Sequence, residues 1–291
     1  MNTGIGPARS PDLEWAHLAY QTDDWYLARN FTIVSRRGPA SVLTSRTECQ
    51  SGNVGEGFAV NSSPTVSGSE NLEVMVEARN YNAYLLRKVG NVMAGRHRIL
   101  DFGAGRGTFA IPMRDWGHEV VCVEPEQVLR SSLTAARLEV HASLDTVPSR
   151  SLEGVYTLNV LEHIQNDKET IAALYRKLAR GGIFYAYVPA FQLLYSAMDD
   201  RVGHVRRYRL GQLIERCRQA GFKVHKAGYS DSLGFLASLV YKTMGSADGS
   251  VNRAGLVLYD RYAFPLSCVL DIATRRLFGK NAWIIASNDA P

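Results

Sequence analysis

The hydrophobic pattern of the chain changes at residue 98. From there, short continuous apolar segments alternate with segments whose apolar positions recur every three or four residues. The first pattern is typical of strands buried on both faces of a sheet, and the second is typical of amphipathic helices. The alternation predicts an α/β fold with a doubly wound sheet. The expected strands are 98–102, 119–124, 138–142, 154–160, 182–189, 222–228 and 282–287, and the expected helices are 107–116, 126–136, 167–179, 210–220, 232–244 and 265–278.

Residues that commonly begin and end helices refine this prediction. Asn166 and Glu169 have the spacing of a capping box for the helix expected at 167–179, and Gly181 is placed to end it. Upstream, a helical pattern of apolar positions starts after Ser69, a predicted N-cap. The segment 44–70 is rich in Ser, Gly, Thr and Asn, which predicts a mobile loop or lid.

Composition narrows the class of protein. The 291 residues are 46% hydrophobic and 21% charged, as in ordinary globular chains. The four cysteines lack metal-binding spacing, so we expect reduced thiols, no metal site and a cytoplasmic protein. The longest apolar run, at about 233–240, is too short to span a bilayer, so no membrane insertion is expected. A net charge of +5 permits an anionic substrate without requiring nucleic acid.

The turn after the first expected strand carries the first candidate chemistry. Gly103 and Gly105 let the backbone approach a ligand closely. A dinucleotide-binding fingerprint needs a third glycine where this chain has Thr108, and a pyrophosphate would be repelled by Asp101. A carboxylate at Asp101 suits a cation, and Glu124 at the end of the next strand can accept both hydroxyls of a ribose. A positive centre combined with a free ribose diol describes S-adenosylmethionine.

Further motifs follow at regular separations, and with them the sequence resembles the class I (Rossmann-like) S-adenosylmethionine-dependent methyltransferases. The resemblance covers about residues 72–228. It implies a mostly parallel seven-stranded sheet in a domain spanning 71–291, with an N-terminal extension over 1–70 and helical cap or substrate segments at about 190–210 and 230–280. The matching segments are 99–109, 120–127, 143–148, 158–167, 180–182 and 218–224.

The resemblance also implies roles for individual residues. Glu124 should bind the ribose, and Tyr81 should close over the cofactor. The remaining cofactor-binding residues are expected at the methionine part (Asp101, Gly103, Gly105, Asn159 and Val160) and at the adenine (Pro125, Ser143 and Leu144).

A second resemblance concerns the acceptor side. A subgroup of small-molecule and lipid-related class I methyltransferases carries a Gly-His-x-Arg-Arg-Tyr segment after the fifth strand, which corresponds here to residues 203–208. It implies catalytic roles for His204 and Tyr208, beside His163 in the loop after the fourth strand. Arginine side chains suit phosphate or carboxylate. The residues expected to contact the substrate are Tyr195, Asp199, Arg206 and Arg207.

Several of these residues also have a purely structural interpretation. His163 either acts as a general base or shapes its loop, and Glu162 is interpreted as a cap or loop anchor. Arg206 and Arg207 either contact substrate or pair with Asp199, Asp200 or Asp231 to fix the loop.

Taken together, the sequence predicts methyl transfer to a small, anionic and partly hydrophobic acceptor, such as a prenyl or lipid phosphate or a natural-product intermediate. The alternative acceptor is an aromatic or sugar-containing secondary metabolite. A non-catalytic cofactor-binding protein and a nicotinamide oxidoreductase are the competing interpretations. Mg²⁺ is expected only with a diphosphate acceptor, held by Asp199 and Asp200. No nucleic-acid partner is expected, and a homo-oligomer is compatible with the sequence.

Overall fold

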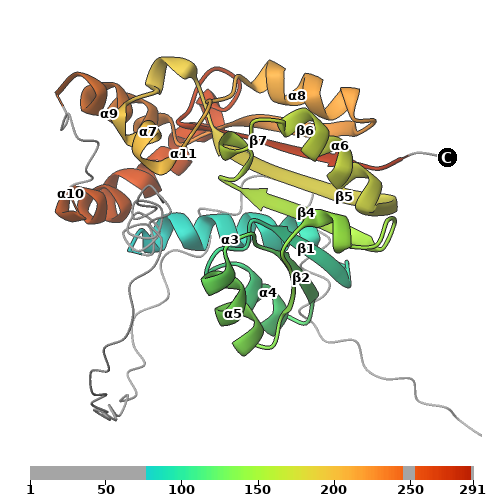
Figure 1. The fold of residues 1–291 in the computed structure, drawn as a ribbon. Helices are drawn as coiled ribbons and strands as arrows, with labels where there is room; N and C mark the ends of the chain where they lie inside the picture. The colour runs from blue at the N-terminus through green and yellow to red at the C-terminus, as the bar shows by residue number, and fades with distance from the viewer. Residues whose placement is uncertain (1–76, 245–252, 290–291) are drawn as a thin grey trace, which may run out of the picture. The chain divides into compact units, whose positions relative to one another are not determined.

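The computed structural model describes residues 77–244 and 253–289, with elements labelled as in Figure 1. Seven strands form a sheet in the order β3-β2-β1-β4-β5-β7-β6. Strands β1 to β5 run parallel, and β7 is antiparallel to β5 and β6. The predicted doubly wound, mostly parallel sheet is therefore confirmed. The strands are β1 (Arg98–Phe102), β2 (Glu119–Val123), β3 (Glu139–His141), β4 (Leu152–Leu158), β5 (Leu178–Pro189), β6 (Lys223–Ser230) and β7 (Asn281–Ser287).

Helices cover both faces of this sheet (Figure 1). On one face α3, α4 and α5 bury side chains against Ile99, and on the other face α6 and α8 pack over Leu100. Neighbouring strand residues point to opposite faces, so one strand feeds both cores. The helices are α3 (Arg79–Met93), α4 (Ala110–Asp115), α5 (Gln127–Ala135), α6 (Asp167–Lys177), α7 (Ala197–Val202), α8 (Leu210–Gln219), α9 (Ser232–Met244), α10 (Arg253–Leu258) and α11 (Phe264–Thr274).

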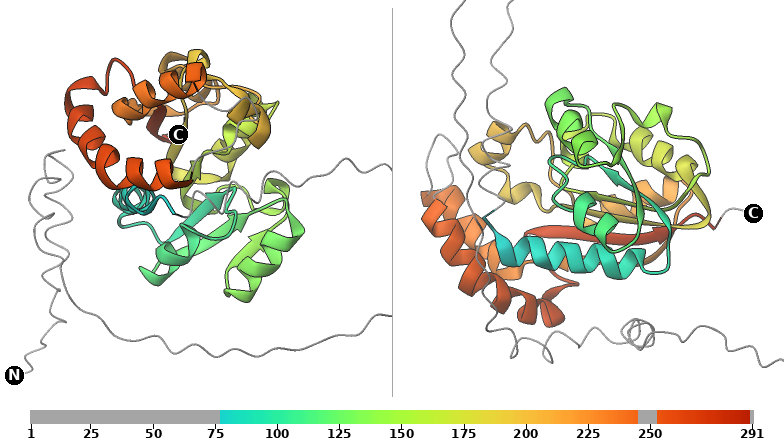
Figure 2. Two further views of the ribbon diagram at one scale, coloured as in Figure 1. Left: turned by 90° about the vertical axis from the view of Figure 1, so that its left-hand side faces the viewer. Right: turned by 90° about the horizontal axis from the view of Figure 1, so that it is seen from below.

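The start of α3 is held by a residue far away in the chain. Asp260, in the turn of π-helix between α10 and α11, accepts hydrogen bonds from the backbone amides of Asn80 and Tyr81, both at 2.9 Å. Figure 2 shows the C-terminal helices lying across this end of α3. Residues 77 and 78 are not helical, so the helix does not run unbroken from Ser69. Ser69 itself and the expected lid at 44–70 lie outside the described residues.

The boundary between α6 and β5 also differs from the prediction. Asn166 is the N-cap of α6, but its side chain makes no capping hydrogen bond, so the predicted capping box does not form. The helix ends at Lys177, and the chain passes directly into β5 at Leu178. Gly181 therefore lies within the irregular start of a strand, with a φ of +75°, instead of ending the helix.

The helical cap expected at 230–280 is present as α9, α10 and α11. These helices lie beyond the end of the sheet toward which β4 points (Figure 1). Asp271 of α11 joins the cap to the sheet by accepting the backbone amides of Asp231 and Ser232, at 2.6 and 2.9 Å, at the start of α9. No helix within the described ranges is long and apolar enough to cross a bilayer.

Candidate functional site

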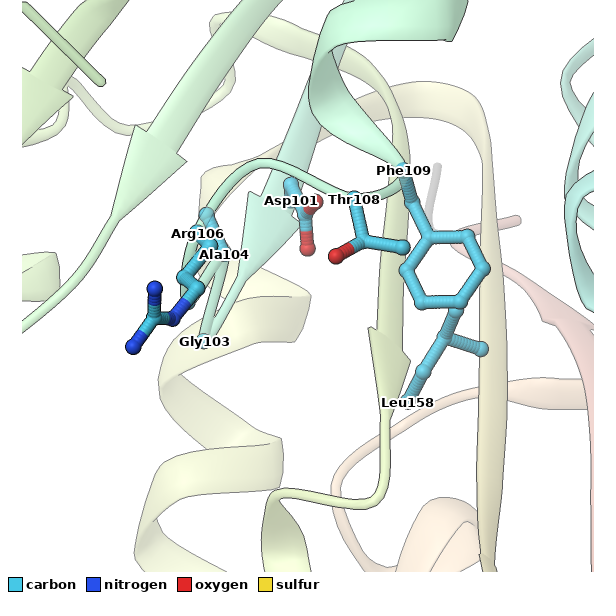
Figure 3. Close-up of a pocket in the computed structure, with 8 residues that line it drawn as sticks. Asp101, Gly103, Ala104, Arg106, Thr108, Phe109 and Leu158 are labelled. Carbon is cyan, nitrogen blue, oxygen red and sulfur yellow. The ribbon is translucent and has the colours of Figure 1, made fainter. Parts of the chain in front are cut away.

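A small cavity opens where β1 ends in the glycine-rich turn. Its volume is about 90 Å³, and its walls include Asp101, Gly103 and Gly105, three of the residues expected at the methionine part of a cofactor. Figure 3 shows the Asp101 carboxylate and the Thr108 hydroxyl directed into the same space, while the Arg106 side chain points away. The turn thus gathers these predicted residues around one hollow.

Asp101 is a carboxyl group in the interior. Its side chain is 2% exposed, and Oδ2 accepts a hydrogen bond from the Tyr156 hydroxyl of neighbouring β4 at 3.0 Å. Burial raises the pKa of Asp101 to about 7, because the hydrogen bond from Tyr156 only partly offsets desolvation and the charge of Glu124 adds to it. A cationic ligand placed here would stabilise the carboxylate form.

Glu124 lies at the end of β2, directly beside the turn. Its side chain is 6% exposed. One carboxylate oxygen accepts the backbone amide of Gly105 at 2.8 Å, and the other accepts the amide of Glu126 at 3.0 Å. Both oxygens are thereby fixed at the carboxyl edge of the sheet, where ligands of doubly wound folds bind.

The two glycines of the turn have different surroundings. Both have positive φ values, +82° at Gly103 and +55° at Gly105. A Cβ added to Gly103 would lie 2.4 Å from Cγ2 of Val160, so this glycine permits close packing between two loops. A Cβ added to Gly105 would meet no atom within 4 Å and would project into open space. The turn therefore leaves space beside Gly105.

A second, larger cavity of about 660 Å³ shares Gly103 with the first. It has the volume of a small-molecule site. Helix α6 forms a further wall with Glu169, Thr170, Ala173 and Arg176, none of which was predicted from the sequence. The predicted residues that line it are Pro125, Ser143, Leu144, Val160 and His163.

Three predicted cofactor residues, Glu124, Asn159 and Tyr81, line neither cavity. The last two contact each other. Asn159, at the end of β4 with a φ of +54°, donates its side-chain amide to the Tyr81 hydroxyl at 3.3 Å. The Tyr81 ring packs edge-on against Phe264 of α11, with 5.4 Å between ring centroids. Helix α3 and the C-terminal cap therefore meet beside the end of β4.

Asp199 precedes the Gly-His-x-Arg-Arg-Tyr segment and binds two of its side chains. It accepts two hydrogen bonds from Arg207, at 2.8 and 3.0 Å, and lies 2.6 Å from Nδ1 of His204. Although burial alone would raise the pKa of Asp199, these two partners lower it to about 2. One arginine of the segment is therefore paired with Asp199, as the structural alternative expected.

The other polar residues of this segment also bind within the protein. Arg206 pairs with Asp167 of α6 at 2.5 Å, a partner that the sequence analysis did not consider. The Tyr208 hydroxyl is buried and donates to Asp167 at 2.6 Å. Tyr195 places its hydroxyl 2.7 Å from Asp200 and 2.6 Å from the His204 carbonyl oxygen. These three predicted site residues line neither cavity.

A cluster of three chemically active side chains lies beside the larger cavity. One carboxylate oxygen of Glu162 and one ring nitrogen each of His163 and His204 lie within 4.8 Å of one another. The rings of the two histidines meet edge-on at 4.7 Å. Glu162 is fully buried, and burial raises its pKa to about 8. Two of these residues were predicted as catalytic; Glu162 was interpreted only as an anchor.

Comparison with known protein families shows which family the chain belongs to. A family described as "Methyltransferase domain" matches residues 70–227, more than half of the chain. The chain belongs to this methyltransferase-domain family. The matched region contains β1 to β5, both cavities and the segment around Asp199.

Individual relatives of the methyltransferase domain are distant. A probable S-adenosylmethionine-dependent methyltransferase of Mycolicibacterium smegmatis is 24% identical over 179 residues, which are 59% of this chain and 65% of that protein. A SAM-dependent methyltransferase of Thermotoga maritima has a TM-score of 0.52 at 13% identity, covering 76% of this chain and 95% of that chain. Phosphoethanolamine N-methyltransferase 2 of Haemonchus contortus, solved with S-adenosyl-L-methionine, gives 0.50 at 18% identity, covering 72% and 53%. These solved structures establish the fold.

The methyltransferase domain contains two site residues that sequence reasoning passed over. Tyr156 supplies the hydrogen bond to Asp101, but in the sequence it is one aromatic residue in an apolar strand. Glu162 precedes His163 in the sequence, and this adjacency was the only feature of the sequence that indicated a place in the site. Its complete burial depends on loops that are distant in sequence, since Val205 donates its backbone amide to the Glu162 carbonyl at 2.9 Å.

The raised pKa of Asp101 predicts a pH-dependent stability of the methyltransferase domain. The folded form holds the Asp101 proton up to about pH 7, whereas the unfolded chain releases it near pH 4. The folded state therefore binds the extra proton between these values, and its stability falls as pH rises through this window, by up to about 4 kcal/mol from this group.

Chemical denaturation of the wild type and Asp101→Asn between pH 4 and 8 measures this contribution. Asparagine resembles the neutral acid, so the difference between the two proteins should grow in favour of the variant as pH rises from 4 to 7. A difference that is independent of pH contradicts the prediction.

Proposed function

We propose that the protein is a S-adenosylmethionine-dependent methyltransferase. The observation that carries the proposal is the placement of Asp101 and Glu124 on adjacent strand ends, on either side of a turn in which Gly105 leaves open space. A buried carboxyl group favours the ammonium and sulfonium charges of such a cofactor, and a fixed carboxylate suits its ribose diol. The family match supports the same cofactor.

In this proposal each cofactor residue has a defined task. Asp101 and the Gly103 turn hold the methionine part, and Glu124 accepts the ribose hydroxyls. Pro125, Ser143 and Leu144 contain the adenine in the larger cavity, whose volume of about 660 Å³ admits it. The bound cofactor supplies an electrophilic methyl group on a sulfonium that leaves readily. The protein then contributes mainly by positioning the acceptor in line with that group.

We propose that the acceptor is a small, partly hydrophobic anion. We also propose that the protein belongs to the methyltransferase subgroup that carries the Gly-His-x-Arg-Arg-Tyr segment. Two cations support this class of acceptor. Arg207 binds Asp199, but its Nη1 is buried without a hydrogen-bond partner. Burial lowers the pKa of Lys280, and the charges of Asp231 and Asp199 partly offset this by favouring its ammonium form. The apolar helices α9 and α11 close the same end of the sheet.

His163 and His204 keep catalytic roles in the proposal, whereas Tyr208, also predicted as catalytic, becomes a positioning residue. His163 lines the larger cavity and is the candidate to touch the acceptor. Tyr208 is buried against Asp167, so its contribution is to position the loop after β4. A free small molecule as acceptor, Mg²⁺ only with a diphosphate acceptor, a homo-oligomer and a cytoplasmic location stay predictions.

The experiment that tests the proposal has two stages. Calorimetry should first detect S-adenosylhomocysteine binding and no binding of NAD or NADP. A labelled-methyl assay should then give transfer to one pool among phosphorylated prenyl compounds, aromatic acids, amines and sugars. Transfer to the amine pool alone would exclude the anionic acceptor while leaving the methyltransferase assignment intact. Tight cofactor binding without transfer to any pool favours the non-catalytic alternative, and preferential binding of NAD contradicts the proposal.

A further inference from the structure

The strongest unassigned feature of the described residues is the carboxylate of Glu162. Its side chain has no exposed surface, and neither oxygen meets a donor of another residue within hydrogen-bond distance. A buried polar group without a hydrogen-bond partner is costly, by about 1–3 kcal/mol. Arg207 interacts electrostatically with Glu162, and Nε2 of His204 lies 3.7 Å from Oε1.

Both histidines near Glu162 have a partner at Nδ1. Nδ1 of His204 lies 2.6 Å from Asp199, and Nδ1 of His163 lies 3.2 Å from the Gly203 carbonyl oxygen. These acceptors hold the proton on Nδ1 and leave Nε2 of each ring with a free lone pair. A histidine whose outer N–H is fixed by a carboxylate or a carbonyl oxygen is the usual form of a metal ligand.

The spacing of the three groups also suits an ion. Metal bonds of about 2.0–2.2 Å to nitrogen and oxygen place neighbouring ligand atoms about 3–4 Å apart. Here Nε2 of His204 and Oε1 of Glu162 are separated by 3.7 Å, and all three ligand atoms lie within 4.8 Å. The backbone hydrogen bond from Val205 to Glu162, at 2.9 Å, ties the loop that carries His204 to the loop that carries Glu162. The ligands are therefore held together by the fold.

We propose that Glu162, His163 and His204 bind one divalent transition-metal ion at the wall of the larger cavity. Two imidazoles and one carboxylate favour Zn²⁺, Fe²⁺ or Co²⁺ over Mg²⁺. No metal site was predicted, because the cysteines lack metal-binding spacing. The ligands proposed here come instead from two segments about forty residues apart in the chain. His163 also lines the cavity, so an acceptor hydroxyl bound to the ion would lose its proton more readily. Only this last role rests on the proposed function.

Co²⁺ is the probe for the site, because its visible absorption reports the ligands directly. The full chain, free of any histidine tag and treated with a chelator, is titrated with CoCl₂, and Zn²⁺ is then added in competition. We expect one Co²⁺ per chain, new visible bands, and loss of those bands on adding Zn²⁺. No measurement here needs methyl transfer, so the result is independent of the proposed activity.

Three variants and one control complete the test. Glu162→Gln, His204→Asn and His163→Asn should each weaken Co²⁺ binding at least tenfold and alter the bands. His163 is exposed, so its variant tests the site even if the substitutions in the interior impair folding. His225→Asn, on β6 beside Ser287, is the matched control and should bind Co²⁺ as the wild type does. Absence of stoichiometric binding, or equal binding by His163→Asn and the wild type, overturns the proposal.

Discussion

Replacing Glu124 with alanine is expected to weaken S-adenosylhomocysteine binding by more than tenfold. In the proposed complex the ribose hydroxyls become buried, and the alanine variant leaves them without an acceptor. An unsatisfied buried polar group costs about 1–3 kcal/mol, and this cost appears directly in the dissociation constant. The variant also removes the acceptor of the Gly105 amide, now at 2.8 Å, which loosens the turn that holds the ligand.

Isothermal titration calorimetry measures this effect, with Glu126→Ala as the matched control. Glu126 follows two residues later, and its side chain is exposed, so its removal should leave the affinity unchanged. Glu124→Gln keeps one acceptor oxygen and should fall between the wild type and the alanine variant. An affinity of Glu124→Ala equal to that of the wild type contradicts the assignment of the ribose site.

Gly103→Ala and Gly105→Ala are expected to affect the protein differently, the first mainly in stability and the second mainly in cofactor binding. At Gly103 the new methyl group meets Val160 at 2.4 Å, in a backbone conformation with φ of +82°. The conformational strain and the overpacking together should lower the free energy of unfolding by about 2–5 kcal/mol. At Gly105 the methyl group meets nothing within 4 Å, so only the conformational cost of about 1–2 kcal/mol applies.

Cofactor affinity should separate the same two variants. The Gly105→Ala methyl group projects into the space proposed for the ligand, so S-adenosylhomocysteine binding should weaken by more than the loss of stability explains. Denaturant unfolding and calorimetry on both variants give the comparison. If Gly105→Ala binds the ligand as the wild type does, the cofactor does not lie against this turn.

The parts of the fold that were predictable depend on local patterns. A buried parallel strand is apolar along its whole length, and α9 was predicted with its observed bounds, Ser232–Met244, from its apolar periodicity alone. Gly221, with a φ of +100°, follows the helix that was expected at 210–220, since few other residues adopt that conformation. These signals lie within a few residues of the feature that they predict.

The parts that were missed depend on contacts across the chain. The N-terminal amides of α3 bind Asp260, which is 180 residues away from Asn80, and no local pattern near Ser69 shows this. Arg206 was considered with Asp199, Asp200 and Asp231. Its partner is Asp167, which lies 39 residues upstream. The gathering of Asp101, Gly103 and Gly105 around one cavity was therefore predictable. The pairing of Arg207 with Asp199 was among the predicted alternatives, whereas that of Arg206 with Asp167 was not.

The position of β7 has a consequence for how the domain folds. This strand lies between β5 and β6, and in the sheet β6 pairs with β7 alone. Until residues 281–287 have been synthesised, β6 has no neighbour, and the edge of β5 stays open to other chains. The sheet is thus completed by inserting a late strand between two earlier ones, a step of high contact order that favours slow folding.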